Sequence, residues 1–369
     1  MKEREGEFLS KTVFEVRSDV RIGILAAKTN WKLKRVLHQL KDLAELSTGQ
    51  VIAFSLKGVK RKQNKVKGYV YWKEKGIWKE TTVKMPDAII NRITLTRKWQ
   101  QFFRELLGTR MINNFTFSKW KMYEWLSTDP TLSKHLPVTQ KILTTKDIIN
   151  FLEQYNEAII KPINSSFGKG IYKITKQENE YLVEYNSKKQ CNSLVFTSEE
   201  LINYFNNKRI NKKYIIQKLI NLYIGNHPVD FRLIMVKNGY GEWEDVGLIA
   251  RKGIKNGVIS NSGNLKIGTF ALQNLLLIPR FEAIKIRKRL TEISLSAVHY
   301  LEKQAGVDAN IGNVGIDLAI DCAWNLWIIE INHRNPRHRM AMDAGFSGIY
   351  EYSNKLLIDY ANLLAINRI

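Results

Sequence analysis

The chain contains 369 residues and has a formal net charge of +23, because 58 lysines and arginines outnumber 35 aspartates and glutamates. Its hydrophobic content of 44% excludes wholesale disorder, and no apolar run approaches the roughly 20 residues needed to cross a bilayer. The excess positive charge favours an anionic partner, which can be nucleic acid, an anionic polymer or an acidic peptide.

The start of the chain and its cysteines bear on cellular location. The first residues are charged and lack an apolar core, so we expect no secretory signal and a cytoplasmic protein. Cys191 and Cys322 lie far apart and are interpreted as free thiols in a reducing compartment. The sequence contains no Cys-x-x-Cys, His-Glu-x-x-His or Gly-x-Ser-x-Gly motif, so zinc hydrolysis and common serine-hydrolase chemistry have no support.

The N-terminal part alternates strands and helices. We predict strands at residues 21–26, 51–55 and 88–93 and helices at 31–46 and 99–107, a pattern typical of a small α/β domain. Residues 68–72 and 76–83 predict a hairpin. Six cationic residues lie between Lys57 and Lys67, and the aromatic residues that follow could stack on bases. The favoured interpretation is a hairpin with aromatics packed on one face and solvated lysines on the other.

A glycine-rich loop follows a strand that ends at Lys161. Gly168 and Gly170 allow the loop backbone to close over a ligand, and its N–H groups with Lys161 and Lys169 can cradle phosphates. Because a strand follows rather than a helix, this is neither a Walker loop nor a Rossmann turn. Ser118 can cap a preceding helix at 119–126. Strands at 181–185 and 194–197 with a helix at 199–206 complete a lid-like subdomain, and an apolar strand at 214–219 follows.

Two charged residues, Asp230 and Arg232, lie on one face of the next predicted strand. A surface salt bridge is the ordinary interpretation of this pair. Arg251 ends a further strand at residues 246–250. Residues 281–304 predict a long helix, and residues 349–364 predict a final helix that caps the preceding module.

The stretch from Gly315 to Pro336 predicts a hairpin with strands at 314–321 and 326–331. Glu330 and Asn332 are two residues apart and point the same way, and Asp317 on the partner strand can lie beside them. Two carboxylates and an amide suit Mg²⁺, which takes few protein oxygens and fills its other positions with water and phosphates. The alternative is that both acids are solvated residues of an edge hairpin.

Five potentially cationic residues follow this hairpin within seven positions: His333, Arg334, Arg337, His338 and Arg339. A solvated loop is the default interpretation of such a run. Its position beside the predicted metal site favours a second interpretation, in which the run holds an anionic acceptor or the transferred phosphoryl group.

Together, the lysine-ended strand with its glycine-rich loop and the late Asp-Glu-Asn set resemble the ATP-grasp superfamily. Pro-Asp-Ala-Ile-Ile-Asn-Arg at residues 86–92, Phe-Ser-Lys-Trp at 117–120 and Asp-Phe-Arg at 230–232 resemble its YheC/YheD branch, proteins associated with the endospore coat. The resemblance covers the chain from about residue 20 onward. It implies an α/β (α+β) ATP-grasp fold, with a pre-ATP-grasp-like α/β domain at 1–112 and an ATP-grasp domain at 113–369 whose lid spans about 135–218.

The resemblance also implies site residues. Those assigned to ATP are Lys119, Lys161, Ser165, Ser166, Gly168, Lys169, Gly170, Gln217, Lys218 and Leu219, with Lys121 as an alternative to Lys119. Those assigned to one or two magnesium ions are Asp317, Glu330 and Asn332. Arg232 or Arg251 would neutralise the phosphate and the intermediate. Some ATP-grasp ligases place an arginine two residues before the aspartate ligand, where this chain has Gly315.

The implied activity is that of a Mg-ATP-dependent ligase that forms an amide or peptide-type bond through an acyl phosphate. The carboxylate and the nucleophile stay open, although the positive charge favours an acidic peptide or an anionic envelope polymer. The resemblance adds the spore coat as a location and coat proteins as partners. A coat scaffold that binds nucleotide without turnover is the alternative, and a nucleic-acid-binding protein lacks any recognised motif here. We expect no membrane partner.

Overall fold

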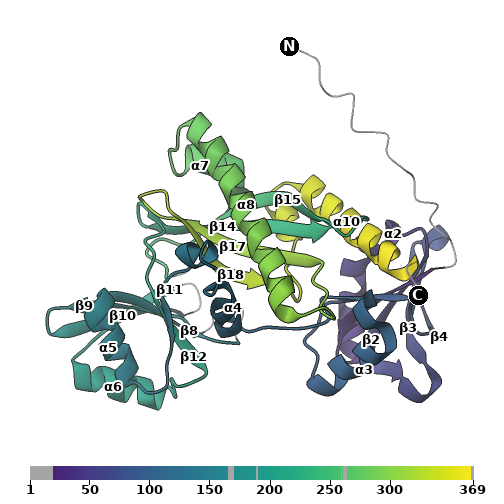
Figure 1. Cartoon of the computed structure of the whole chain (residues 1–369), viewed down its shortest axis with the longest axis horizontal. Helices are drawn as coiled ribbons and strands as arrows, with labels where there is room; N and C mark the ends of the chain where they lie inside the picture. The colour runs from purple at the N-terminus through teal and green to yellow at the C-terminus, as the bar shows by residue number, and fades with distance from the viewer. Residues whose placement is uncertain (1–19, 165–169, 188–189, 259, 261–263, 367–369) are drawn as a thin grey trace, which may run out of the picture. The chain divides into compact units, whose positions relative to one another are not determined.

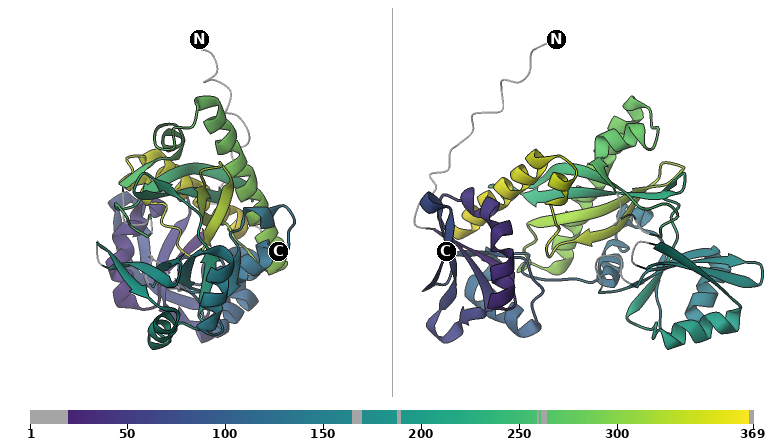
Figure 2. Two further views of the ribbon diagram at one scale, coloured as in Figure 1. Left: turned by 90° about the vertical axis from the view of Figure 1, so that its left-hand side faces the viewer. Right: turned by 180° about the vertical axis from the view of Figure 1, so that it is seen from behind.

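The computed structural model describes residues 20–164, 170–187, 190–258, 260 and 264–366. The chain divides into two compact units (Figures 1 and 2). Unit 1 comprises Met1–Asn114, Asn238–Glu242 and Asn354–Ile369, and unit 2 comprises Phe115–Lys237 and Trp243–Ser353. Both units combine helices with sheets, which makes the fold α+β. Within the described ranges, no helix is long and apolar enough to cross a membrane.

The described part of unit 1 is built on a sheet with strand order β4-β3-β2-β1-β5-β6. Its strands are β1 (Arg21–Ala27), β2 (Gln50–Lys60), β3 (Lys65–Trp72), β4 (Ile77–Lys84), β5 (Ala88–Asn91) and β6 (Met111–Ile112). β1 pairs in parallel with β2 and β5, whereas β2, β3 and β4 form an antiparallel meander. The strands and the hairpin predicted for the N-terminal part are confirmed.

Short helices complete unit 1: α1 (Asn30–Val36), η1 (Leu37–Leu40), α2 (Lys41–Glu45) and α3 (Arg97–Leu107). The single helix predicted at residues 31–46 is therefore three pieces. On α3, Phe103 and Leu107 are four residues apart and share the buried face, where they join the core with Phe54 and Ile89.

Unit 2 contains two sheets, and the first has strand order β11-β10-β9-β8-β12-β7. Its strands are β7 (Thr139–Lys141), β8 (Glu157–Pro162), β9 (Tyr172–Gln177), β10 (Glu180–Ser187), β11 (Gln190–Phe196) and β12 (Tyr214–Lys218). Helices α5 (Lys146–Tyr155) and α6 (Ser198–Asn207) lie on the same side of it (Figures 1 and 2). Phe151 of α5 and Phe205 of α6 share one core with Ile160 of β8. We call this part the lid subdomain.

The second sheet of unit 2, the central sheet, has strand order β16-β15-β14-β17-β18, with β13 beside β14. Its strands are β13 (Tyr223–Ile224), β14 (His227–Lys237), β15 (Trp243–Lys252), β16 (Asn264–Ile267), β17 (Asn313–Ile320) and β18 (Leu326–Asn332). The long helix α8 (Arg280–Ala305) crosses one face of this sheet (Figure 1). Phe231 and Leu233 of β14 pack with Leu290 and Val298 of α8 in the largest core of the described residues.

The remaining helices of unit 2 are α4 (Lys119–Leu126), α7 (Gly268–Asn274) and α9 (Met340–Asp343). The final helix α10 (Ser347–Ile366) starts in unit 2, and its residues from Asn354 onward group with unit 1. Ala365 packs there with Val20 and Ala88. This grouping differs from the predicted assignment of the whole final helix to the ATP-binding module, because the apolar end of the helix is buried against the N-terminal sheet.

Candidate active site

The hairpin β17–β18 places the predicted acidic residues side by side. Asp317 lies opposite Glu330, and Gly315 lies opposite Asn332. Residues directly opposite in an antiparallel pair project to the same face, so the three predicted oxygen ligands share one face of the central sheet. Asp321 accepts the backbone N–H groups of Ala323 and Asn325 at 2.9 Å each and closes the turn between the strands.

A β-bulge at Ile329 is required for this arrangement. Leu318 pairs with Ile328, but the next residue, Asp317, pairs with Glu330, so Ile329 has no partner in the register. In an unbroken ladder Asp317 would face Ile329, and Glu330 would project to the side of the sheet that α8 covers. The extra residue therefore turns the end of β18 so that its polar side chains meet Asp317.

Two arginines from neighbouring strands bind Asp317. Arg232 lies opposite Asp317. Its Nε donates a hydrogen bond to Asp317, and its Nη2 donates another at 3.1 Å. Its Nη1 donates to the Pro336 carbonyl at 2.9 Å. Arg251 donates from Nε and Nη2 to both oxygens of Asp230, at 2.7 and 2.5 Å, and its Nη2 lies 3.1 Å from Asp317 Oδ1.

All four of these charged residues are buried on the face of the central sheet away from α8. The interpretation of Asp230 and Arg232 as a surface salt bridge is therefore wrong, because each residue pairs across strands in the interior. Burial raises the pKa of Asp317, but the guanidinium groups of Arg232 and Arg251 outweigh it and hold this pKa below its usual value. Burial likewise opposes the charge of Arg251, yet the two carboxylates raise its pKa.

The absence of a side chain at Gly315 leaves room for the side chain of Arg232. A Cβ atom at Gly315 would lie 2.7 Å from Cδ and 2.9 Å from Nη1 of Arg232, closer than real Cβ contacts allow. The side chain of Arg232, from the neighbouring strand, thus lies over the glycine that precedes Asp317 by two residues.

Lys119, at the start of α4, joins the same face. Its Nζ donates to Glu330 Oε1 at 2.8 Å, and only 11% of its side chain is exposed. The Ser118 side chain caps the helix by accepting the N–H of Lys121 at 3.1 Å, as predicted. Lys121 instead pairs with Glu124 at 3.5 Å on the surface. Of the two candidate lysines, the structure therefore brings only Lys119 to the acidic hairpin.

Lys161, at the end of β8, is buried with 5% of its surface exposed. Its Nζ donates to Gln217 Oε1 at 2.8 Å, and Gln217 Nε2 donates to Thr139 Oγ1 at 2.7 Å. Burial and the nearby charge of Lys119 together lower the pKa of Lys161 to about 8, against the opposing effect of Glu330 and Asp317. The lid subdomain thus presents an ammonium group whose charge has little compensation.

The other residues assigned to ATP have mixed outcomes. Ser165, Ser166, Gly168 and Lys169 lie outside the described residues. Gly170 has a φ of +72°, a conformation that side chains rarely adopt. The backbone N–H groups of Lys218 and Leu219 donate within the protein, to the carbonyls of Val138 at 2.8 Å and Glu157 at 3.2 Å.

The run after Asn332 is less cationic than predicted. His333 is buried, its ring stacks on Phe117 at 3.9 Å, and its Nε2 accepts the Phe117 N–H at 3.3 Å. Burial and the charge of Arg334 lower the pKa of His333 to about 3, so this ring is neutral. Its predicted contribution to an anion site is wrong, because the ring anchors the start of α4 to the end of β18.

Two contributions of residues that carry the site were not predicted: the side chain of Gln217 as the partner of Lys161, and Asp230 as the partner of Arg251. A signal for both exists in the sequence. Each polar residue stands inside an apolar strand, Tyr-Ile-Ile-Gln-Lys in β12 and His-Pro-Val-Asp-Phe-Arg-Leu-Ile-Met-Val-Lys in β14. Polar groups in such strands are buried only with hydrogen-bond partners.

The oxygen ligands suit a hard cation, with one restriction. The oxygens of Asp317 accept N–H groups from Arg232, Arg251 and Asn332, the last from Nδ2 to Oδ2 at 3.2 Å. Glu330 accepts a hydrogen bond from Lys119. In the described residues, no group of three or more His, Cys, Asp or Glu side chains could hold a metal. Two carboxylates and an amide still fit Mg²⁺, provided that a guanidinium group releases an oxygen of Asp317.

A lid subdomain, a central antiparallel sheet and an acidic hairpin that is approached by Lys119 of α4 and Lys161 of β8 are typical of the ATP-grasp class. The chain resembles D-alanyl-alanine synthetase A from Vibrio cholerae O1 biovar eltor, with a TM-score of 0.55, 11% identity and coverage of 95% of this chain and 99% of that one. It also resembles N5-carboxyaminoimidazole synthetase from Staphylococcus aureus complexed with ADP, with a TM-score of 0.50, 10% identity and coverage of 91% and 77%.

Within this class, the chain belongs to the YheC/D-like ATP-grasp family, whose model matches residues 108–364. It is 24% identical over 365 residues to the endospore coat-associated protein YheD of Bacillus subtilis strain 168, covering 93% of this chain and 78% of YheD. The superfamily, the branch and the fold predicted from the sequence are confirmed.

Proposed function

We propose that this protein is a Mg²⁺-ATP-dependent ligase that joins a carboxylate to an amine through an acyl phosphate. The observation that carries the proposal is the convergence of opposite charges on one face of unit 2. Lys119 contacts Glu330 at 2.8 Å, and the charges of Glu330, Lys119 and Asp317 all act on the buried ammonium of Lys161. Such an arrangement is suited to a polyphosphate and its counter-ions.

The reaction needs placement and charge neutralisation more than a reactive side chain. A carboxylate oxygen of the substrate attacks the γ-phosphorus, the bond to the β–γ bridging oxygen breaks, and ADP leaves with that electron pair. The amine then attacks the acyl carbon, and inorganic phosphate departs. Lys119 and Lys161 would neutralise the phosphates, and the lid subdomain, which carries Lys161, would exclude water from the acyl phosphate.

The two arginines have different capacities for a phosphate. Arg232 uses Nε, Nη1 and Nη2 for Asp317 and Pro336, whereas Arg251 uses Nε and Nη2, and among the described residues Nη1 has no hydrogen-bond acceptor. We therefore assign Arg251 to the transferring phosphoryl group. Arg232 would act as a positioning residue that orients Asp317.

Glu330 and Asn332 would hold magnesium, joined by Asp317 once one of its hydrogen bonds opens. When bound, the metal would spread the charge of the β- and γ-phosphates during transfer.

A second candidate function is a coat scaffold that binds nucleotide without turnover. The hydrogen bonds of Asp317 support this candidate, since three side chains already donate to the carboxylate oxygens that a metal would need. The similarity to a coat-associated protein also supports a place at the spore coat for either function. Both functions include nucleotide binding, so turnover separates them.

The first test is calorimetric titration of ATP, with and without magnesium, into the wild type and Glu330→Gln. Magnesium-dependent binding that weakens about tenfold in Glu330→Gln is expected, because a charge-assisted ligand is lost. Glu292→Gln, on the exposed side of α8, is the matched control. The absence of binding to folded wild type would exclude the ligase. Binding without ADP release across panels of carboxylates and amines would favour the scaffold.

A further inference from the structure

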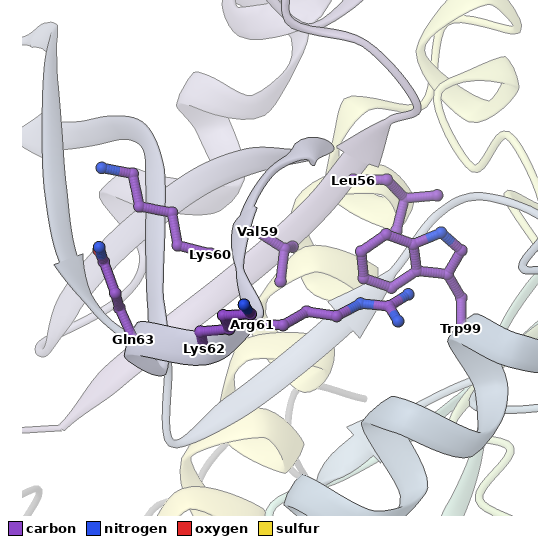
Figure 3. Close-up of a pocket in the computed structure, with 7 residues that line it drawn as sticks. All are labelled: Leu56, Val59, Lys60, Arg61, Lys62, Gln63 and Trp99. Atoms are coloured by element: carbon purple, nitrogen blue, oxygen red, sulfur yellow. The ribbon is translucent and has the colours of Figure 1, made fainter.

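Unit 1 has a hollow of about 380 Å³ at the tip of the β2–β3 hairpin (Figure 3). Leu56 and Val59 form its apolar side, and the end of β2 with the turn that follows it supplies four consecutive polar side chains: Lys60, Arg61, Lys62 and Gln63. Asn64, with a φ of 49°, closes this turn in the left-handed conformation and leads the chain into β3. The hollow is therefore apolar on one side and cationic on the other.

Trp99 of α3 holds Arg61 in place. The guanidinium carbon lies 3.8 Å from the centre of the indole ring and 4.9 Å from that of Phe102, and Figure 3 shows the Arg61 side chain reaching to Trp99. The indole is also stacked on Phe103 at 5.7 Å. A guanidinium group that is held against an aromatic ring can still donate two hydrogen bonds to a carboxylate from its N–H edge.

We propose that this hollow is a docking site for an acidic peptide in extended conformation. Carboxylates of such a peptide would pair with Lys60, Arg61 and Lys62, which line the hollow, and an intervening apolar side chain would contact Leu56 and Val59. Single-stranded nucleic acid is the weaker fit, because it needs an aromatic ring free for base stacking and the ring of Trp99 is already in contact with Arg61 and Phe103. The site is independent of the proposed ligase activity.

The test measures anisotropy of a short fluorescein-labelled peptide of glutamates with one central leucine, at physiological ionic strength and without nucleotide. The triple variant Lys60→Gln/Arg61→Gln/Lys62→Gln should bind about tenfold or more weakly than the wild type. The matched control Lys146→Gln/Lys212→Gln/Lys303→Gln removes the same charge from exposed positions of unit 2 and should retain affinity. Equal losses in the two variants would overturn the proposal in favour of bulk charge.

The apolar side of the hollow and the class of partner need two further comparisons. Replacing the central leucine of the peptide by serine should weaken binding about threefold, because burial of the leucine side chain is lost. A single-stranded oligonucleotide that bound more tightly than the peptide, and lost affinity in the same triple variant, would overturn the assignment to a peptide.

Discussion

Lys161 makes the stability of unit 2 depend on pH in an unusual direction. Burial lowers its pKa from 10.5 to about 8. Between these two values the unfolded chain holds a proton that the folded chain has released, so the free energy of unfolding should rise with pH from about 8 to 10.5. Below pH 8 the folded protein bears the full cost of a buried ammonium group.

The size of this effect follows from the interval between the two pKa values. At about 1.4 kcal/mol for each pH unit, the interval corresponds to a gain of about 3 kcal/mol. Other titrating groups also change over this range, and Lys161→Met removes only the one of interest. The difference in unfolding free energy between the wild type and Lys161→Met should therefore rise by about 3 kcal/mol between pH 8 and 10.5.

Urea unfolding of both proteins at intervals across this range measures the difference, and Lys146→Met, changed at an exposed lysine, is the control. ATP affinity should fall over the same range in the wild type, because a neutral Lys161 no longer attracts phosphate, and should stay level in Lys161→Met. Parallel stability curves for the wild type and Lys161→Met would refute the assignment of a lowered pKa to this lysine.

Two further predictions concern the buried charges. Gly315→Ala should lower the free energy of unfolding by about 1–3 kcal/mol, because the new Cβ displaces Arg232. The control Gly348→Ala places its Cβ in open space and should leave this free energy unchanged. If urea titration shows that both variants match the wild type, the packing of Arg232 over Gly315 is excluded. Asp230→Asn should destabilise by about 3 kcal/mol, since Arg251 keeps one carboxylate instead of two, and a loss under about 0.5 kcal/mol by the same method would contradict a tightly coupled pair.

Local patterns explain why much of the fold could be predicted from the sequence. The two-residue spacing of Glu330 and Asn332 indicates that they share a face, and the register brings Asp317 beside them after the bulge at Ile329. The helix start at Ser118 and the strand end at Lys161 also follow from neighbouring residues. In each case the signal lies within a few positions of the residue concerned.

The pairing of the charges could not be predicted because it depends on strand order. β14 lies between β15 and β17, and this arrangement alone decides that Arg232 meets Asp317 and that Asp230 meets Arg251. A charged residue in a strand has the same local pattern whether its partner is water or a residue far away in the chain. His333 shows the same limit, since its neutral state results mainly from burial, which depends on segments far away in the chain such as the one that carries Phe117.

The bulge at Ile329 places a constraint on chain length rather than on residue type. Leu326 and Ile328 face the core before it and Ile331 faces the core after it, so the inward positions change from even to odd numbers at this point. Deleting one residue there would exchange the inward and outward side chains for the rest of the strand. A relative can therefore carry almost any side chain at this position and keep the acidic face, but a relative that lacks the position cannot.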